Sequence, residues 1–327
     1  MSPSSQTMIL IVDLKPGRPP MLAIEAPHDA ARWAAEHRAA LRAALDEHGS
    51  LLVRGLGLRE PTQVGAVFRQ IATLMTEREA FAPRKRYGEG VYSASHWPPN
   101  QPMCMHHELS YALEAPGLLL LACLGEPAAG GATPLADSAA VLRGLPAELV
   151  DRFDRTGWLL VRNYNEEIGA SVAEAFGSDD RGDVDRYCRA HAIEHEWLPD
   201  GGLRTLQRRR AIVEHRGQRC WFNQIAFLNE WTIDPEVREY ITDVYGEDRL
   251  PFTTRFGNGD PIDAEIVQTI HQAYAAHTVR EPWQAGDLML VDNLRTAHGR
   301  EPYSGPREVL VAMADPERVP DGASMGT

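Results

Sequence analysis

Cysteine is scarce in this sequence, and the few cysteines are far apart. There are four, Cys104, Cys123, Cys188 and Cys220, with no C-x-x-C pair and no regular ladder of spacings. Disulfide frameworks and structural zinc sites both show regular, close cysteine spacings. The sequence therefore argues against both, and its isolated cysteines are typical of a protein in the reducing cytosol.

Long apolar runs are also lacking. The longest one, residues 118–124, is far shorter than the roughly 20 residues that a membrane-spanning helix needs. The first 20 residues contain neither a basic start nor a long apolar stretch, which argues against a signal peptide. We therefore expect a soluble, cytoplasmic protein with no membrane partner.

Basic residues are outnumbered by acidic ones. The chain of 327 residues has 33 lysines and arginines against 46 aspartates and glutamates, a net charge of −13. A field of this sign repels polyanions, so the composition excludes nucleic acid as a natural partner. The apolar fraction of 43% is ordinary for a globular protein and provides for a sizeable core.

Apolar patterning divides the chain into many short extended pieces and fewer helices. We expect strands over residues 9–14, 50–56, 91–93, 116–124, 158–162, 193–197, 203–206, 211–215, 219–222, 288–291 and 308–313. Helices are expected over residues 28–47, 62–75, 139–143, 146–153, 235–245 and 264–277, and in outline over 165–190.

This order of elements has no βαβ alternation and no internal repeat. It favours a mainly β fold with flanking helices, built on a double-stranded β-helix (jelly-roll, cupin-like) core. No composition break marks a linker. We therefore expect one domain over residues 1–327, with a helical and loop insertion around 165–210.

The stretch MCMHHELSY, residues 103–111, contains two candidate metal ligands. In an extended segment, His106 and Glu108 project from one face and His107 from the other. An imidazole and a carboxylate that converge in this way provide two ligands of a 2-His-1-carboxylate iron site. The same triplet is also compatible with an ordinary surface strand end. A third ligand elsewhere in the chain is therefore needed to support the iron site.

His298 is the histidine that best completes such a site. It follows a buried strand over residues 288–291 and the polar pair Asp292-Asn293. The other histidines lie in charged or polar stretches without metal-ligand spacing. His107 is assigned a supporting or substrate-side role, because alternation turns it away from Glu108.

Several motifs together resemble the taurine dioxygenase-like (TauD/TfdA) family of Fe(II)- and 2-oxoglutarate-dependent oxygenases. Within it, the chain is most similar to the glutamate-ligand amino-acid hydroxylases of nonribosomal peptide pathways, which are clavaminate synthase-like. The matching pieces occur in family order and cover most of the chain. They are residues 105–111 (MHHELSY), 130–137 (GGATPLAD), 221–224 (WFNQ), 286–293 (GDLMLVDN) and 298–307 (HGREPYSGPR).

The resemblance implies roles for particular residues. His106, Glu108 and His298 would bind iron, and Thr133 and Arg307 would hold the distal carboxylate of 2-oxoglutarate. Arginine suits that role because its guanidinium is always charged and binds a carboxylate through two hydrogen bonds. Arg300 is the rival candidate. Fe(II), 2-oxoglutarate and O₂ are the implied cofactor and co-substrates.

The implied activity is hydroxylation of an unactivated C–H bond in secondary metabolism. The substrate would be an amino acid, either free or tethered to a peptidyl carrier protein. Related halogenases lack the carboxylate ligand, so Glu108 favours hydroxylation. Desaturation or epoxidation by the same iron chemistry is an alternative. A zinc hydrolase and a non-catalytic, partner-binding family member are alternatives of a different class.

Candidate substrate contacts are less specific. The sequence suggests pocket walls upstream of the iron motif and in the WFNQ piece, and arginines for a substrate carboxylate. The residues are Tyr92, Ser93, Trp97, Asn223, Arg295 and Arg300.

Overall fold

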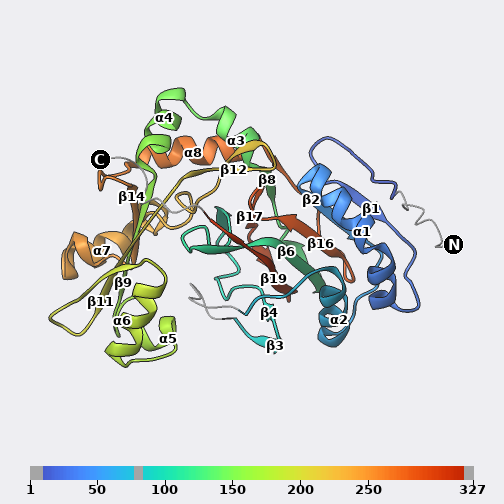
Figure 1. Ribbon diagram of the computed structural model, residues 1–327, viewed down its shortest axis with the longest axis horizontal. Helices are drawn as coiled ribbons and strands as arrows, with labels where there is room; N and C mark the ends of the chain where they lie inside the picture. Colours follow the sequence, from blue (N-terminus) through green and yellow to red (C-terminus); the bar gives the residue numbers. More distant parts are fainter. Residues whose placement is uncertain (1–9, 77–83, 320–327) are drawn as a thin grey trace.

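Two sheets face each other in the core of the protein, and helices cover their outer surfaces (Figure 1). A computed structural model describes residues 10–76 and 84–319. The larger sheet has seven strands in the order β1-β2-β16-β6-β19-β4-β3, and the smaller one has four in the order β15-β8-β17-β5. This arrangement is the predicted jelly-roll type of core.

The bounds of the strands in these two sheets are as follows. The large sheet contains β1 (Met21–Ala23), β2 (Ser50–Arg54), β3 (Arg86–Gly88), β4 (Val91–Ser93), β6 (Glu114–Gly125), β16 (Leu288–Asp292) and β19 (Glu308–Arg318). The small sheet contains β5 (Met103–His106), β8 (Leu135–Asp137), β15 (Thr278–Val279) and β17 (Thr296–Arg300).

Alternation along the central strand β6 separates two cores. Leu118 and Leu120 belong to the core under the N-terminal helices, whereas Leu119 and Leu121 belong to the core between the two sheets. Because both faces of β6 are covered, it reads as a continuous apolar run. The residues that face the smaller sheet form part of the floor of the site described below.

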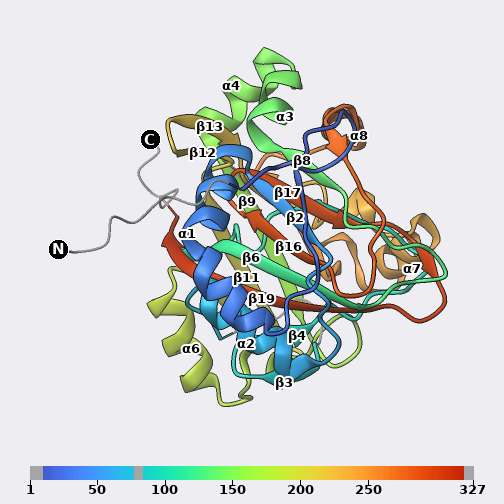
Figure 2. The ribbon, with the colours of Figure 1, turned by 90° about the vertical axis from the view of Figure 1, so that its right-hand side faces the viewer.

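The N-terminal helices α1 (Ala30–His48) and α2 (Pro61–Ile71) cover the outer face of the large sheet (Figure 2). The Asp29 side chain accepts a hydrogen bond from Arg32 N at the start of α1. Gly49, with a φ of 78°, ends it in the left-handed conformation that suits glycine. The chain then enters β2, which pairs with β16. This pairing places the N-terminal part of the chain next to the strand that precedes His298.

A separate four-stranded sheet, in the order β10-β11-β9-β14, lies beside the core. Its strands are β9 (Trp158–Tyr164), β10 (Glu194–Trp197), β11 (Leu203–Arg209) and β14 (Phe252–Phe256). The short helices α5 (Val172–Phe176) and α6 (Arg181–Ala190) pack on it through an apolar cluster that includes Tyr164, Val184 and Leu203. The single-domain organisation with an insertion around 165–210 stays a prediction.

The remaining elements connect these layers. They are β7 (Ala129–Gly130), α3 (Ser138–Gly144), α4 (Ala147–Thr156), β12 (Ile212–His215), β13 (Gln218–Trp221), α7 (Pro235–Tyr245), α8 (Ala264–Ala276) and β18 (Tyr303–Ser304), with 3-10 turns at Glu230–Thr232 and Glu247–Arg249. Within residues 10–76 and 84–319, every helix is too short or too polar to cross a lipid bilayer.

The predicted strand over residues 9–14 is wrong in its described part. Residue 9 lies outside the described residues, and residues 10–14 make only an isolated bridge between Asp13 and Met21. The strand lies instead at Met21–Ala23, after the Pro/Gly-rich turn, where parallel pairing with β2 provides hydrogen bonds. An apolar run of strand length does not form a strand without an edge to pair with.

Candidate metal centre

Strand pairing places two histidines side by side although they are far apart in the sequence. His106 is the last residue of β5 and His298 is in the middle of β17, and the two are direct partners in the antiparallel pair. Direct partners across a ladder project from the same face. Their rings lie 4.3 Å apart between centroids, and both side chains are buried.

Glu108 completes a cluster of three ligand atoms. Its Oε1 lies 3.8 Å from His298 Nε2 and 4.0 Å from His106 Nε2. The three atoms all lie within 4.8 Å of one another. The strand ends at His106, however, so Glu108 is presented by the following turn, in which Leu109 has a φ of 53°. The expected convergence is present, but a turn and not strand alternation produces it.

The protonation states suit a divalent cation. His106 Nδ1 lies 2.8 Å from the carbonyl oxygen of Cys104, which can only accept a hydrogen, so the lone pair of Nε2 faces the cluster. Burial, and then His298, lower the pKa of His106 to about 3, which keeps it neutral. Burial alone would raise the pKa of Glu108, but Arg84 and the two histidines hold it well below its usual value. Neutral imidazoles and an ionised carboxylate are the forms that bind metal.

Asn293 clamps the main chain of Glu108. Its Oδ1 accepts a hydrogen bond from Glu108 N at 2.9 Å, and its Nδ2 donates to Glu108 O at 3.0 Å and to Pro116 O at 2.9 Å. The amide therefore replaces the strand partner that the turn lacks. Asn293 follows β16 directly, so a strand of the large sheet fixes the position of the carboxylate.

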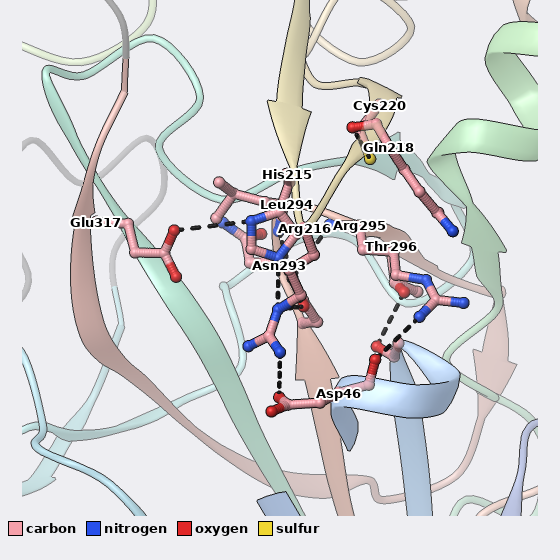
Figure 3. A network of polar contacts seen from close by, with 12 residues as sticks. Asp46, His215, Arg216, Gln218, Cys220, Asn293, Leu294, Arg295, Thr296 and Glu317 are labelled. Carbon is pink, nitrogen blue, oxygen red and sulfur yellow. Dashed lines mark hydrogen bonds and ion pairs between the residues drawn. The ribbon is translucent and has the colours of Figure 1, made fainter. Parts of the chain in front are cut away.

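A network of charged residues holds the turn that follows β16 (Figure 3). Asp292 accepts hydrogen bonds from Leu294 N and Arg295 N through Oδ1, and its Oδ2 lies 2.8 Å from His215 Nε2. Arg216 lies beside this pair and forms a 2.7 Å ion pair with Asp46 of α1. The network joins the β12–β13 hairpin, helix α1 and the turn that contains Asn293.

His107 points away from the cluster, as expected, although it lies just past the end of β5. Its Nδ1 lies 2.5 Å from Asn293 O, and its Nε2 lies 3.0 Å from Ser138 Oγ, so the ring is fully engaged behind the site. Burial lowers its pKa to about 4. His107 therefore supports the loop that contains the ligands, and the alternative substrate-side role has no support.

The WFNQ piece acts through its last residue. Gln224 Nε2 donates to His107 O at 2.6 Å and so holds the same loop from another side. Asn223, predicted as a pocket wall, instead donates to Ala211 O and accepts from Ile225 N. It does not line the cavities at the cluster, because its amide stabilises the start of its own loop.

Arg84 contacts a ligand residue directly and was not predicted from the sequence. Its Nη2 donates to Glu108 Oε1 at 2.8 Å, and its Nε donates to Ser95 Oγ at 3.1 Å. The ion pair between Arg84 and Glu108 joins two loops, and contacts between loops leave no periodic pattern in the sequence. The only hint was the basic run that begins at Arg84 in a long loop before the iron motif.

A narrow inner cavity opens on the three ligand residues. Apolar side chains of the two sheets form much of its wall, among them Leu119, Leu121, Val309 and Val311. These are the residues that alternation turns toward the smaller sheet. The polar residues of the wall are Arg84, Ser95, Thr133, Arg300 and Arg307.

Thr133 and Arg307, which the resemblance assigns to 2-oxoglutarate, both lie on this wall. Thr133 is buried, and its Oγ1 accepts a hydrogen bond from Trp283 Nε1 at 3.1 Å. Arg307 Nε donates to Gly131 O at 3.0 Å. Burial, and then the neighbouring Arg300, lower the pKa of Arg307 to about 10. A cation destabilised in this way favours a bound anion.

An outer cavity of about 490 Å³ adjoins the inner one and shares Arg84, Ser95, Arg300 and Arg307 with it. Trp97 and Ser93 line it, and their contact with a substrate stays a prediction. Arg300 lines both cavities, but it donates to the main-chain oxygens of Trp97, Pro98 and Gln101. It thus fixes the loop over residues 97–101.

Two further predicted substrate residues do not reach the cavities. Tyr92 is buried on β4 and belongs to neither lining. Arg295 lies 3.2 Å from Asp137 and donates to the main-chain oxygens of Asp46 and Glu47. Its guanidinium therefore ties the C-terminal end of α1 to the start of α3, and the predicted contact with a substrate carboxylate has no support.

The residues present fit a divalent metal and a dicarboxylate. Two imidazole nitrogens and one carboxylate oxygen converge on one point, and this donor set suits non-haem iron. His298 Nδ1 is buried without a hydrogen-bond partner among the described residues. Arg307 donates to the main-chain oxygen of Gly131, and its neighbouring titratable groups among the described residues are Arg300, Tyr303 and Cys123, so its charge is available to an anionic ligand.

Comparisons with known proteins agree with this geometry. The model of the family described as "Taurine catabolism dioxygenase TauD, TfdA family" matches residues 14–313. The dapdiamide synthesis protein DdaC of Enterobacter agglomerans is 34% identical over 83% of this chain and 84% of its own length. A clavaminate synthase-like protein of Arabidopsis thaliana is 29% identical over 82% of each chain.

Solved structures share the fold. The crystal structure of PvcB from Pseudomonas aeruginosa superposes with a TM-score of 0.54 at 14% identity, covering 95% of this chain and 92% of PvcB. The family match spans most of the chain, and the ligand cluster has the donors that this chemistry requires. The chain therefore belongs to the TauD/TfdA family of Fe(II)- and 2-oxoglutarate-dependent dioxygenases.

Proposed function

We propose that this dioxygenase hydroxylates an unactivated C–H bond of an amino acid, either free or as a carrier-tethered aminoacyl group, in secondary metabolism. The observation that carries the proposal is the position of Glu108 beside both histidines at one cavity. A similar relative is named for dapdiamide synthesis, which supports a biosynthetic role. A cytoplasmic location fits this role and remains part of the proposal.

His106, Glu108 and His298 are proposed as the iron ligands. Thr133 and Arg307 are proposed to bind the distal carboxylate of 2-oxoglutarate, one through a hydroxyl and the other through a charged fork. Bound iron, 2-oxoglutarate and O₂ supply the oxidising power, with succinate and CO₂ as co-products.

The residues of the chain have positioning roles in this proposal. Asn293 and Gln224 hold the ligand loop from two sides and so fix where the carboxylate can lie. Leu119, Leu121, Val309 and Val311 keep the inner wall apolar, which excludes water from the reacting carbon. Trp97, on the outer cavity, packs edge-on against Phe227, which in turn stacks on His106.

Anaerobic addition of Fe(II) and 2-oxoglutarate tests the proposal. We expect a weak visible charge-transfer band in the wild type and its loss in His106→Ala. His37→Ala is the matched control, because His37 stacks on Trp33 of helix α1, away from both cavities. An absent band in the wild type, or an unchanged band in His106→Ala, contradicts the assignment. Product analysis then separates hydroxylation from desaturation and epoxidation.

A further inference from the structure

The hairpin formed by β12 and β13 packs behind the metal centre. The ring of Phe222, which follows β13, lies 5.0 Å from the ring of His107 between centroids. Phe222 also shares one apolar cluster with Val213 of β12 and with Leu294 of the turn after β16. The hairpin therefore contacts both segments that position Glu108, which are the loop after β5 and the turn after β16.

His215 is the last residue of β12, and its buried ring reaches the turn after β16 (Figure 3). Its Nε2 lies 2.8 Å from Asp292 Oδ2. An ionised carboxylate can only accept a hydrogen bond, so Nε2 carries the hydrogen and donates it. Two further charged groups face the ring: Arg216 Nε lies 3.2 Å from Nε2, and Glu317 Oε2 lies 3.8 Å from Nδ1.

Asp292 links this contact to the shape of the turn. Its side chain is almost fully buried, and Oδ1 accepts hydrogen bonds from the main-chain N–H groups two and three residues later. Aspartate fixes the residues that follow it in this way in many turns. The next residue is Asn293, whose amide bonds both main-chain groups of Glu108. Three consecutive contacts thus join His215 to a proposed metal ligand.

Loss of the His215 donor would weaken the hold on Asp292 Oδ2. Arg216 Nε lies 3.5 Å from this oxygen, which is longer than an ordinary hydrogen bond. A buried oxygen that loses its donor costs free energy, so we expect the turn to shift until Oδ2 reaches Arg216 or water. Asn293 would move with the turn. Strand β5 ends before Glu108, so the carboxylate depends on that amide for its position.

We propose that His215 is a positioning residue of the metal centre, which fixes the carboxylate of Glu108 through Asp292 and Asn293. The inference rests on the proposed iron ligands and adds to them a residue that lines neither cavity. The alternative is that His215 only stabilises the hairpin. A purely stabilising role would change the stability of the protein without a selective effect on metal binding, so experiment can separate the two.

Two amides of different length test the contact. The side-chain nitrogen of glutamine lies the same number of bonds from Cα as histidine Nε2, whereas that of asparagine corresponds to Nδ1. His215→Gln can therefore still donate to Asp292, and His215→Asn is too short to do so. His195→Asn is the matched control, because Nε2 of His195 on β10 also lies 2.8 Å from an aspartate oxygen, that of Asp185.

Full-length wild type and variants are titrated with Mn(II) by calorimetry, and urea unfolding shows whether each is folded. We expect His215→Asn to bind Mn(II) about tenfold more weakly than the wild type, because loss of a residue that orients a ligand typically costs about 10- to 100-fold in metal affinity. His215→Gln and His195→Asn should each stay within threefold of the wild type.

The double variant His215→Asn/Asn293→Ala tests the path. If His215 acts through Asn293, its replacement has nothing further to disturb once the amide is gone, and the two effects do not add. The double variant should then bind Mn(II) within threefold of Asn293→Ala alone. A larger further loss would show that His215 acts by another path and would contradict the inference.

A second ligand separates a local effect on the metal from a general loosening of the site. N-oxalylglycine, a 2-oxoglutarate analogue that does not turn over, is titrated into each protein at saturating Mn(II). Thr133 and Arg307, the proposed partners of its distal carboxylate, belong neither to the hairpin nor to the turn after β16. We therefore expect His215→Asn to bind the analogue within threefold of the wild type.

Four results would overturn the inference. His215→Asn binds Mn(II) within threefold of the wild type, His215→Gln binds it as weakly as His215→Asn, His195→Asn loses as much affinity, or N-oxalylglycine loses as much affinity as Mn(II). Should His215→Asn not fold, His215→Leu takes its place with the same expectations. A wild type that binds neither Mn(II) nor N-oxalylglycine contradicts the proposed function instead.

Discussion

Asn293 does for Glu108 what a neighbouring strand does for a residue inside a sheet. One amide side chain satisfies both the N–H and the C=O of the same residue, just past the end of β5. A turn held in this way restricts where the carboxylate can lie, because both main-chain polar groups of Glu108 have partners. At the scale of single residues, the metal centre therefore depends on a side chain that touches no metal.

Replacing Asn293 with alanine should lower the affinity for Mn(II) by about 10- to 100-fold, because the carboxylate loses its fixed position. It should also lower the free energy of unfolding by about 1–3 kcal/mol, since buried main-chain groups lose their partners. Calorimetric Mn(II) titration and urea unfolding measure the two effects.

Asn163→Ala is the matched control. Asn163 is also a buried asparagine, on β9 of the separate four-stranded sheet, and its side chain donates to the main-chain oxygens of Asp248 and Leu250 just before β14. It should lose similar stability and keep its Mn(II) affinity. Equal Mn(II) affinities for Asn293→Ala and the wild type would refute the positioning role.

At the scale of elements, the pairing of β5 with β17 brings the two histidines together. The register shifts between His298 and Arg300, so a bulge lies directly after the ligand. Gly299 occupies it, and a Cβ there would lie 2.7 Å from Met103 O. The close approach of the two backbones leaves no room for a side chain.

Gly299→Ala should therefore push β17 away from β5. We expect a loss of about 1–3 kcal/mol in the free energy of unfolding, together with weaker Mn(II) binding through His298. Gly125→Ala is the control at another register shift, because its Cβ would meet the nearest atom, Glu308 Cβ, at an ordinary 3.5 Å. Wild-type stability and Mn(II) affinity in Gly299→Ala would show that the bulge tolerates a side chain.

The bounds of a helix or strand can be predicted from the sequence where residues at its ends favour starting or stopping it. Helix α7 has the predicted bounds, residues 235–245, because Asp234 caps it, Pro235 starts it and Gly246 follows it. Strand β19 was expected to end at residue 313 but continues to Arg318. Pro316 argues locally against a strand, yet its neighbours pair along β6, and this pairing comes from the fold.

The same limit applies to the site. His106, Glu108 and His298 were predictable because their types and order match a family pattern. Arg84, Gln224 and Asn293 contribute through contacts between distant loops, which no spacing in the sequence encodes. Arg295 and Asn223 have the right chemistry for a substrate site, but the fold uses them elsewhere.

At the scale of the whole molecule, two features act together on one cavity. The face of the large sheet that packs against the smaller sheet is apolar. The charged residues of the cavity lie at one end of this face. The chain carries a net charge of −13, whereas the described lining of the inner cavity includes three arginines and one glutamate. The protein can therefore stay acidic outside while its site attracts carboxylates.

The position of a bound metal ion shows which side chains are its ligands. Crystals of the protein grown with Mn(II) and N-oxalylglycine would give an anomalous signal from manganese. We predict a single strong peak within bonding distance of His106 Nε2, one oxygen of Glu108 and His298 Nε2. A peak bonded to His107, or no peak at this cavity, would contradict it.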